Sequence, residues 1–236
     1  MSYFQDVGER DFVHIRIADI SSLGLAKSHS ALLRLLPSED REKVSAYVRE
    51  NDQMLCLAGR TMIRALAMET TGRSDIRLRF SEFGKPSFAF ENAPHFNLSH
   101  SGDCVALAYC NSPVGVDIEQ CKDFEWEDAA GFFSDAEKAL ILSDRDNLGC
   151  FYKVWTIREA ISKAEGQGLP AFDSSAISID FARKEALLNG KKLFFDDWNV
   201  SGYSLSVCSQ RRFDAVVSFV TREDWQRMTE RFSEAL

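Results

Sequence analysis

The chain has 236 residues, of which 45% are hydrophobic and 27% charged, and its formal net charge is −8. These fractions are those of a globular protein and exclude a disordered chain, and the length allows one large domain or two of about 110 residues each. The acidic balance argues against a generic nucleic-acid surface, but it is compatible with a local basic pocket for an anionic ligand.

The first part of the chain predicts one strand, two helices and a group of short strands. Alternating apolar and polar residues from Phe12 to Ile20 predict a strand. Acidic residues after Ser38 predict a helix start, and the helical pattern continues to about Thr71 as two helices that meet near residues 50–52. Gly72 is a plausible stop. Short strands are then predicted at residues 76–80, 87–90, 96–99 and 104–109.

The second part of the chain predicts a similar series. A break at residues 111–113 precedes a strand over residues 114–119, and Ser134 begins a helix. A longer helix runs from about Asn147 to Glu165 and ends at Gly166 and Gly168. Further strands are predicted at residues 177–181, 192–195, 198–201, 204–208 and 214–220, followed by a closing helix at 222–232.

The two parts resemble each other at an offset of about 100 residues. Residues 76–80 parallel 177–181, and residues 96–99 parallel 198–201. We therefore predict an α+β fold with two similar lobes, residues 1–111 and 112–236, related by a pseudo-two-fold axis with the active site between them. The alternative is that any two modules of a helix followed by strands look alike at this level. Two fused lobes favour a monomer.

Membrane and secretion signals are absent from the sequence pattern. No apolar run approaches the ~18 residues that span a bilayer, and the N-terminus lacks the basic and apolar regions of a signal peptide. The six cysteines form no Cys-x-x-Cys pair and have no histidine at zinc-ligand spacing. We therefore expect reduced thiols in a cytoplasmic protein, with no membrane or nucleic-acid partner.

An acidic strand and a later helix supply the residues with the clearest chemistry. On a strand, Asp117 and Glu119 share one face. On a helix, Trp155, Glu159 and Lys163 form one stripe. A third carboxylate beside the first two would give the oxygen-rich site that Mg²⁺ prefers, with phosphate and water completing the shell, and the lysine would add a phosphate clamp or proton carrier. The alternative is a solvated strand face and an ordinary helical ion pair.

Other polar residues suggest contacts to phosphate. Arg60 and Arg64 lie four apart on the long helix, where they form either a phosphate-binding face or an exposed face that only aids solubility. Lys85 lies in a rigid Gly-Lys-Pro turn. His100 follows Ser99, but adjacent residues of an extended segment point to opposite faces and no Gly-x-Ser-x-Gly motif is present, which disfavours a serine hydrolase. His100 is therefore expected to make a phosphate or base contact, or to cap a turn. Walker A and dinucleotide-binding motifs are absent.

Together these motifs resemble the 4′-phosphopantetheinyl transferase superfamily, and within it the two-lobed Sfp type that activates peptide synthetases and similar carrier-protein systems. The resemblance extends from about residue 41 to 169 and rests on five motifs in order. The motifs are Gly59-Arg60-Thr61-Met62-Ile63-Arg64, Phe83-Gly84-Lys85-Pro86, Phe96-Asn97-Leu98-Ser99-His100-Ser101-Gly102, Val114-Gly115-Val116-Asp117-Ile118-Glu119, and residues 151–163 with 166–169.

The resemblance implies transfer of 4′-phosphopantetheine from coenzyme A to a serine of an apo acyl or peptidyl carrier protein, an acidic helical domain. The other product is adenosine 3′,5′-bisphosphate. It implies Asp117, Glu119 and Glu159 as Mg²⁺ ligands, Glu159 also as the base, and Lys163 as the lysine near the α-phosphate. Residues implied to contact coenzyme A are Arg60, Lys85, His100, Lys43, Ser99 and Asp117.

The sequence departs from the family pattern at two places, and two rival functions follow from the same motifs. Relatives often have a basic residue near Met54 and Leu55, and some have a lysine where this chain has Asp40. One rival is a non-catalytic coenzyme A-binding module, which a missing carboxylate would favour. The other is a different Mg²⁺-dependent phosphodiester-cleaving enzyme, many of which use a second metal ion or a nucleophilic aspartate.

Overall fold

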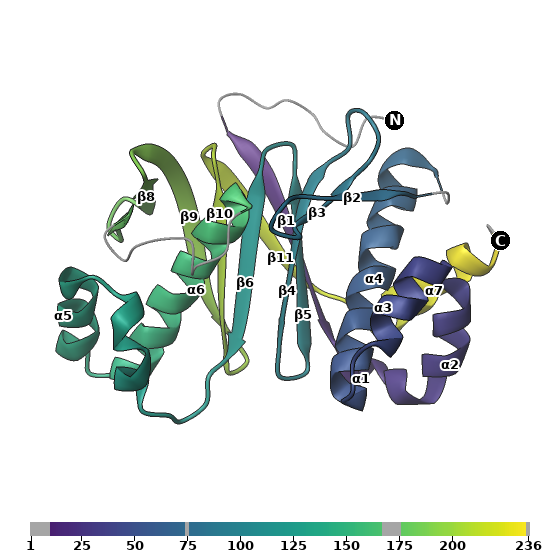
Figure 1. Ribbon diagram of the computed structural model, residues 1–236, viewed down its shortest axis with the longest axis horizontal. Coiled ribbons are helices and arrows are strands. Elements are labelled where there is room, and N and C mark those ends of the chain that lie inside the picture. The colour runs from purple at the N-terminus through teal and green to yellow at the C-terminus, as the bar shows by residue number, and fades with distance from the viewer. Residues whose placement is uncertain (1–9, 74–75, 167–175, 235–236) are drawn as a thin grey trace.

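The computed structural model describes residues 10–73, 76–166 and 176–234. Two sheets occupy the centre, with helices packed outside them on both sides (Figure 1). The first sheet has the order β11 (Phe213–Phe219), β1 (Asp11–Asp19), β5 (Cys104–Cys110) and β4 (His95–Ser101). The second has the order β6 (Val114–Gln120), β10 (Tyr203–Ser209), β9 (Lys191–Val200), β8 (Glu185–Leu188) and β7 (Ile177–Asp180).

The helices divide between the two lobes. The first lobe holds α1 (Ile20–Leu23), α2 (Leu25–Leu35), α3 (Ser38–Ser45), α4 (Glu50–Thr71) and a separate hairpin of β2 (Leu78–Phe80) and β3 (Pro86–Phe88). The second holds the 3-10 helix η1 (Trp126–Phe132), α5 (Asp135–Ser143) and α6 (Asn147–Glu165). The last helix, α7 (Arg222–Glu234), packs beside α4 (Figure 1). The predicted α+β class with two similar lobes is confirmed.

The parallel between the lobes follows the predicted order. In each lobe a long helix precedes a hairpin and then a pair of antiparallel strands: α4, β2–β3 and β4–β5 in the first, and α6, β7–β8 and β9–β10 in the second. Both long helices end at a glycine in the left-handed conformation, Gly72 with φ 70° and Gly166 with φ 77°. Glycine adopts this conformation without the steric cost of a Cβ, which explains why the helices stop where the sequence predicts. Gly168 lies outside the described residues.

The C-terminal end of the chain belongs with the first sheet, which differs from its predicted place in the lobe 112–236. β11 pairs in parallel with β1, and the N–H of Val220 donates to the carbonyl of Ile17 at 2.8 Å. Trp225 and Met228 of α7 are buried in the core of the first lobe. The first lobe is therefore closed by a segment about 200 residues away from β1 in sequence.

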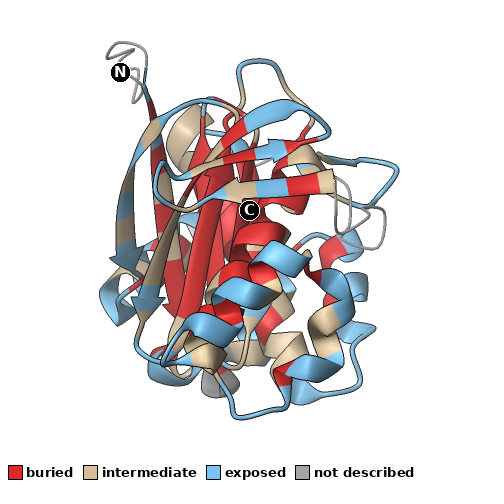
Figure 2. Ribbon diagram, turned by 90° about the vertical axis from the view of Figure 1, so that its left-hand side faces the viewer, coloured by how far each residue is buried: buried red, intermediate tan, exposed pale blue. Residues whose placement is uncertain are grey.

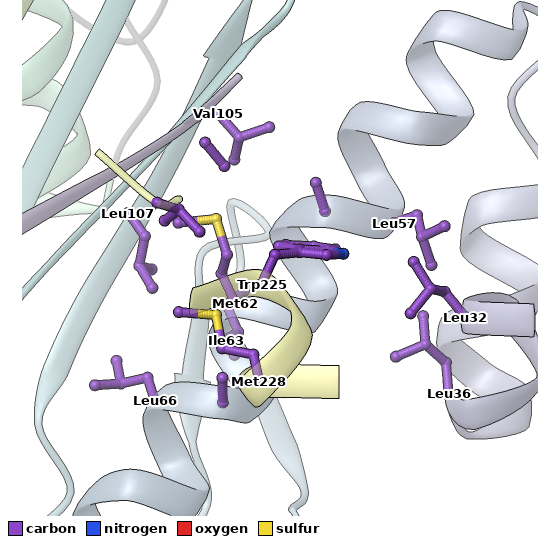
Figure 3. Packing of buried hydrophobic residues seen from close by; sticks show 14 of the residues in the cluster. Leu32, Leu36, Leu57, Met62, Ile63, Leu66, Val105, Leu107, Trp225 and Met228 are labelled. Carbon is purple, nitrogen blue, oxygen red and sulfur yellow. The ribbon is translucent and has the colours of Figure 1, made fainter. Parts of the chain in front are cut away.

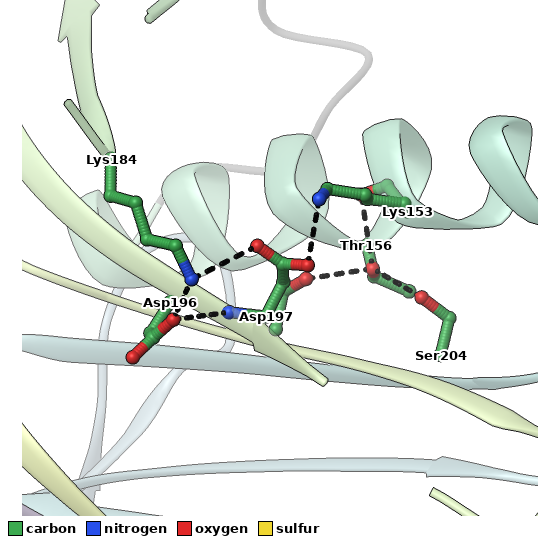
Figure 4. A network of polar contacts seen from close by, with 7 residues as sticks. Lys153, Thr156, Lys184, Asp196, Asp197 and Ser204 are labelled. Atoms are coloured by element: carbon green, nitrogen blue, oxygen red, sulfur yellow. Dashed lines mark hydrogen bonds and ion pairs between the residues drawn. The ribbon is translucent and has the colours of Figure 1, made fainter. Parts of the chain in front are cut away.

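Four further elements differ from the sequence prediction. The two strands predicted at residues 192–195 and 198–201 are one continuous strand, β9 (Lys191–Val200). Its central acids are paired, Asp197 with Lys153 at 3.0 Å and Asp196 with Lys184 (Figure 4). Helices α1 and α2 and strand β8 were not predicted; α1 and β8 have only four residues each, and Gly24 separates α1 from α2.

The core has one apolar layer between the sheets and others beneath the helices. In the first lobe, Met62, Ile63 and Leu66 of α4 pack against Leu107 of β5 and Met228 of α7 (Figure 3). Between the sheets, the inward residues of β1, β5, β6 and β10 form a second buried cluster. Figure 2 shows the buried residues gathered in the central strands and the helix faces against them. No described helix is long and apolar enough to cross a membrane, and all six cysteines are free.

The edges of the two sheets meet at β4 and β6. The side chain of Asn97 on β4 accepts from the backbone N–H of Val116 at 2.9 Å, and Ser101 Oγ accepts from the N–H of Gln120 at 3.1 Å. These side chains satisfy edge N–H groups of β6 that would otherwise lack partners. The polar residues of β4 thereby fix the position of the acidic strand relative to the first lobe.

Helix α6 lies directly on β6 because residue 115 is glycine. A Cβ at Gly115 would lie 2.0 Å from the carbonyl oxygen of Ala160 and 2.4 Å from the backbone nitrogen of Ala164. On its other side, the hydroxyl of Thr156 forms hydrogen bonds with Ser204 at 3.1 Å and Ser206 at 2.8 Å (Figure 4). The position of α6, and hence of the residues on its exposed stripe, is therefore set by close backbone packing.

Candidate active site

Strand β6 and helix α6 bring the predicted acidic residues and lysine together. Val116 and Ile118 face the core between the sheets, so that Asp117 and Glu119 occupy the opposite face, toward α6. The ammonium of Lys163 donates to Asp117 Oδ1 at 2.6 Å and to Ser99 Oγ at 3.0 Å, and Ser99 also donates to Asp117 Oδ1 at 2.7 Å. The site therefore joins β4 of the first lobe to β6 and α6 of the second.

The carboxylates of this site perturb one another. Burial raises the pKa of Glu159 to about 7, and the negative charges of Asp117 and Glu119 add to the rise while Lys163 opposes it. Burial also raises the pKa of Glu119, where Asp117 acts in the same direction and the hydrogen bond from Ser101, at 2.6 Å, opposes it. Burial therefore makes both glutamates harder to ionise than a free carboxyl group, and the charge of Asp117 contributes to both shifts.

Asp117 has one buried carboxylate oxygen without a hydrogen-bond donor among the described residues. Asp117 is 2% exposed, and its Oδ2 is buried without a hydrogen-bond partner. A buried carboxylate oxygen without a donor is costly, and a divalent cation would satisfy it. Within the described ranges, however, no group of three or more His, Cys, Asp or Glu residues is arranged to enclose a metal ion. The donor set fits a hard cation chemically, but the side chains are not assembled into a complete cage.

His100 lies on the opposite face of β4 from Ser99 and Ser101, as alternation predicts. Partial burial lowers the pKa of its imidazole, and the positive charge of Lys163 lowers it further, whereas Asp52 and Asp117 oppose the shift. A neutral imidazole there can accept or donate a hydrogen bond.

Arg60 and Arg64 do not form the open phosphate-binding face that their spacing suggested. Both contact Asp40: Arg60 Nη1 at 3.1 Å and Arg64 Nε at 2.6 Å. All three are buried, with exposures of 8% for Arg60, 4% for Arg64 and 3% for Asp40. Asp40, the residue that departs from the family pattern, therefore neutralises two buried arginines. Arg64 is a structural residue. The guanidinium of Arg60 also lies over the ring of Phe80, with Cζ 5.9 Å from the ring centroid.

Lys43 lies on α3 at the same aromatic ring. Its ammonium is 5.2 Å from the centroid of Phe80, and Phe80 is 51% exposed. Lys43 and Arg60, far apart in sequence, are thus brought to one half-exposed ring on the first lobe. Such a ring with cations at its face is a surface on which a flat, anionic group can bind.

Lys85 is positioned differently from the prediction. Its ammonium donates to the backbone carbonyls of Lys163 at 2.5 Å, Val114 at 3.0 Å and Ala164 at 3.1 Å. Burial lowers its pKa to about 8, and the nearby charge of Glu165 opposes this shift. The side chain that we expected to hold the nucleotide end of coenzyme A therefore binds the end of α6.

Sequence reasoning missed several residues that support the site. Asn97 and Ser101 were quoted within a motif but given no role, although polar residues at every second position of a strand signal a common polar face. Gly115 also had no predicted role, and only the packing of α6 reveals it. Two other basic residues of α6 have acidic partners: Arg158 is buried against Glu137 at 2.9 Å, and Lys153 binds Asp197.

Two cavities lie away from the carboxylates. One of about 670 Å³ is bordered by the β2–β3 hairpin and the end of α6, including Phe80, Lys85 and Gly166. Another of about 580 Å³ lies between the C-terminal half of α4, the first sheet and α7, and includes Arg16, Tyr109 and Arg231. The first borders the lobe seam and is close to the aromatic ring of Phe80.

Comparison with known proteins agrees with this two-lobed arrangement. Residues 25–112 match the family model described as 4′-phosphopantetheinyl transferase, N-terminal, and residues 113–208 match the 4′-phosphopantetheinyl transferase superfamily model. The transferase ffp of Bacillus subtilis is 33% identical over 190 residues, which cover 76% of this chain and 84% of that protein. Sfp of Bacillus subtilis (strain 168) is 33% identical over 147 residues, or 61% of this chain and 66% of that protein.

A more distant relative is the human L-aminoadipate-semialdehyde dehydrogenase-phosphopantetheinyl transferase, which is 29% identical over 188 residues, or 70% of this chain and 60% of that protein. The chain thus belongs to the 4′-phosphopantetheinyl transferase superfamily, and within it to the two-lobed Sfp type, as the motifs predicted.

Proposed function

We propose that this protein transfers 4′-phosphopantetheine from coenzyme A to a serine hydroxyl of an apo acyl or peptidyl carrier protein, with Mg²⁺ as cofactor. The observation that carries the proposal is the meeting of Asp117, Glu119, Glu159 and Lys163 at the seam between the lobes of a chain from this family. A diphosphate ester needs charge neutralisation and alignment for its displacement, and this arrangement supplies the groups for both.

Asp117, Glu119 and Glu159 are the residues that would hold Mg²⁺. The unpartnered Oδ2 of Asp117 and the raised pKa values of the two glutamates support this assignment, because a cation would relieve both. Bound there, Mg²⁺ would neutralise charge on the diphosphate. Lys163 presently donates to Asp117 Oδ1, so that it is placed to turn its ammonium toward an incoming phosphate.

Coenzyme A would bind across the first lobe. We assign its nucleotide end to the surface around Phe80, with Lys43 and Arg60 at the ring, and to His100 and Ser99 on β4. The negative phosphates of coenzyme A suit these cationic and hydroxyl groups. The ammonium of Lys85 is already occupied by three backbone carbonyls.

Glu159 is the proposed general base. Its carboxylate lies one helical turn before Lys163 on α6 and is a group that can accept a proton. In the proposed step the serine hydroxyl loses its proton to Glu159, and the serine oxygen forms a bond to the phosphorus that carries pantetheine. The bond from that phosphorus to the bridging oxygen breaks, and adenosine 3′,5′-bisphosphate leaves with the bonding electrons.

The carrier protein would dock beside η1. Phe124 and Phe132 are 43% and 47% exposed, and they flank a segment that leads from β6 toward α6. Basic residues on the opposite lobe, Arg41, Lys43 and Arg49, would complement an acidic carrier. Because both lobes of one chain supply the site, we infer that the protein acts as a monomer, and we propose a cytoplasmic location consistent with its free thiols.

Intact-mass spectrometry of several apo carrier proteins incubated with this protein and coenzyme A tests the proposal. The expected result is a gain of one phosphopantetheine mass that depends on Mg²⁺ and disappears with a chelator. Coenzyme A binding without transfer to any carrier would favour a non-catalytic module. Release of free phosphopantetheine without a carrier would favour a different phosphodiester-cleaving enzyme.

A further inference from the structure

Lys85 connects the first lobe to the C-terminal end of α6. An ammonium has three N–H donors, and in Lys85 they have three carbonyl acceptors within 3.1 Å: Lys163, Ala164 and Val114. Two of these carbonyls are in the last turn of α6 and one is at the start of β6. The ammonium therefore has no donor left for a phosphate in this arrangement.

The local sequence aims this side chain. The N–H of Gly84 donates to the carbonyl of Ser81 at 2.9 Å, and Ser81 Oγ accepts from the N–H of Lys85 at 3.1 Å, which closes the turn between β2 and β3. Gly84 has φ 80°, a conformation that favours glycine. Across the seam, a Cβ at Gly166 would lie 3.5 Å from Lys85 Cδ, so the lysine stem passes alongside the end of the helix.

A buried ammonium can stabilise the C-terminal end of a helix. The last carbonyls of an α-helix have no partner within the helix and carry its negative pole. Gly166 N–H satisfies part of this need, at 3.2 Å from the carbonyl of Lys163. Lys85, which belongs to the other lobe, donates further hydrogen bonds to these carbonyls. The last turn of α6 is therefore stabilised by a side chain from outside the helix.

That last turn carries Lys163. Its main-chain carbonyl accepts from Lys85, while its side-chain ammonium donates to Asp117 and Ser99. Resting on the proposed function, we infer that Lys85 is a positioning residue for the transfer reaction, which acts through the backbone of Lys163 rather than by binding coenzyme A. It holds the end of α6 against β6 so that the Lys163 ammonium stays beside Asp117.

The test compares Lys85→Met with Lys191→Met in carrier modification assays. Lys191 binds Glu165 at the same helix end, at 2.8 Å, but its side chain is 48% exposed, so its loss controls for removal of a lysine there. Lys85→Met is expected to lower kcat about tenfold or more with KM for coenzyme A changed by less than about threefold, because small misplacements reduce kcat. Lys191→Met is expected to match wild type. A raised KM with normal kcat would mean that Lys85 contacts the nucleotide and would overturn the inference.

A double-mutant cycle with Lys163→Ala separates positioning from a general loss of stability. If Lys85 acts through Lys163, Lys85→Met changes kcat by less than about twofold in the Lys163→Ala background. An equal loss in both backgrounds would overturn the inference. Should Lys85→Met fold poorly, Lys85→Gln keeps two N–H donors and is expected to retain intermediate turnover.

Hydrogen exchange provides a readout that needs no transfer activity. Amides in the last turn of α6, up to Gly166, should exchange faster in Lys85→Met than in wild type, and Lys191→Met should leave them unchanged. Unchanged exchange in Lys85→Met would refute the contact itself. If wild type transfers nothing to any carrier, the proposed function fails, while this comparison still decides whether Lys85 holds the helix.

Discussion

Because α6 approaches β6 closely at Gly115, we expect even the methyl group of an alanine at this position to have a large effect. In Gly115→Ala, the new Cβ would lie 2.0 Å from the Ala160 carbonyl oxygen, where ordinary contact begins at 3.4 Å, so the gap must open by about 1.4 Å. The atoms in the way are backbone, which cannot rotate aside as a side chain can. The helix, or the acidic strand beneath it, has to move.

The size of the effect follows from that displacement. Overpacking of this kind destabilises proteins by about 1–3 kcal/mol, which in a chain of this length lowers Tm by roughly 2–12 °C. The same shift separates Glu159 and Lys163 on α6 from Asp117 on β6, and a misplacement of about 1 Å can reduce turnover about 10²-fold. We therefore expect Gly115→Ala to lose turnover more severely than stability.

Circular-dichroism melting and carrier modification kinetics, measured on the same preparations, check this expectation. Gly131→Ala in η1 is the matched control for the melting measurement, because a Cβ there meets no atom within 4 Å. Gly59→Ala is an intermediate case, since its Cβ would meet the Leu98 side chain at 2.6 Å rather than backbone. Wild-type melting and turnover in Gly115→Ala would refute the view that α6 is held by direct backbone contact.

Four other perturbations test separate parts of the structure. Glu159→Ala should abolish transfer while coenzyme A binding is only partly weakened. Normal turnover of this variant in saturating Mg²⁺, measured by intact mass, would contradict the role assigned to Glu159. Lys163→Ala should lower kcat more than it weakens coenzyme A binding measured by calorimetry, and equal losses would make it a binding residue only. Asp40→Ala leaves Arg60 and Arg64 buried without their carboxylate, which should lower the free energy of unfolding by about 3–5 kcal/mol; a loss below about 1 kcal/mol in urea titrations, in the range of an exposed pair, would contradict this. The pKa of Lys85 is lowered from 10.5 to about 8, so between these values the unfolded chain binds more protons than the folded one, and stability relative to Lys85→Met should rise with pH across that window. Parallel pH–stability curves for the two proteins would show that Lys85 does not titrate as described.

Local periodicity was enough to predict the elements that carry the site. The strand over residues 114–120 and the helix over 147–165 follow from alternation and from helix-start and glycine-stop signals, because these depend on neighbours within a few residues. The same periodicities predicted that Asp117 and Glu119 share a face and that Glu159 and Lys163 share a stripe. The order of the motifs then predicted the family, which the comparisons confirm.

The partners of the charged residues could not be predicted in this way. Arg60 and Arg64 have the spacing of a phosphate-binding face, but the chain brings Asp40 to them from 20 and 24 residues away. Lys85 meets the carbonyl of Lys163 across 78 residues, and β11 meets β1 across about 200. No local pattern records these contacts, because they depend on how whole elements pack.

The sequence by itself determined which residues lie on which face of each element and to which family the chain belongs. Only the tertiary structure decided whether an arginine or lysine side chain on such a face is free to bind a ligand or is already paired with another group of the protein. Burial is the physical reason: a buried charge must find a compensating partner, and a partner from a distant segment becomes visible only once the lobes are assembled.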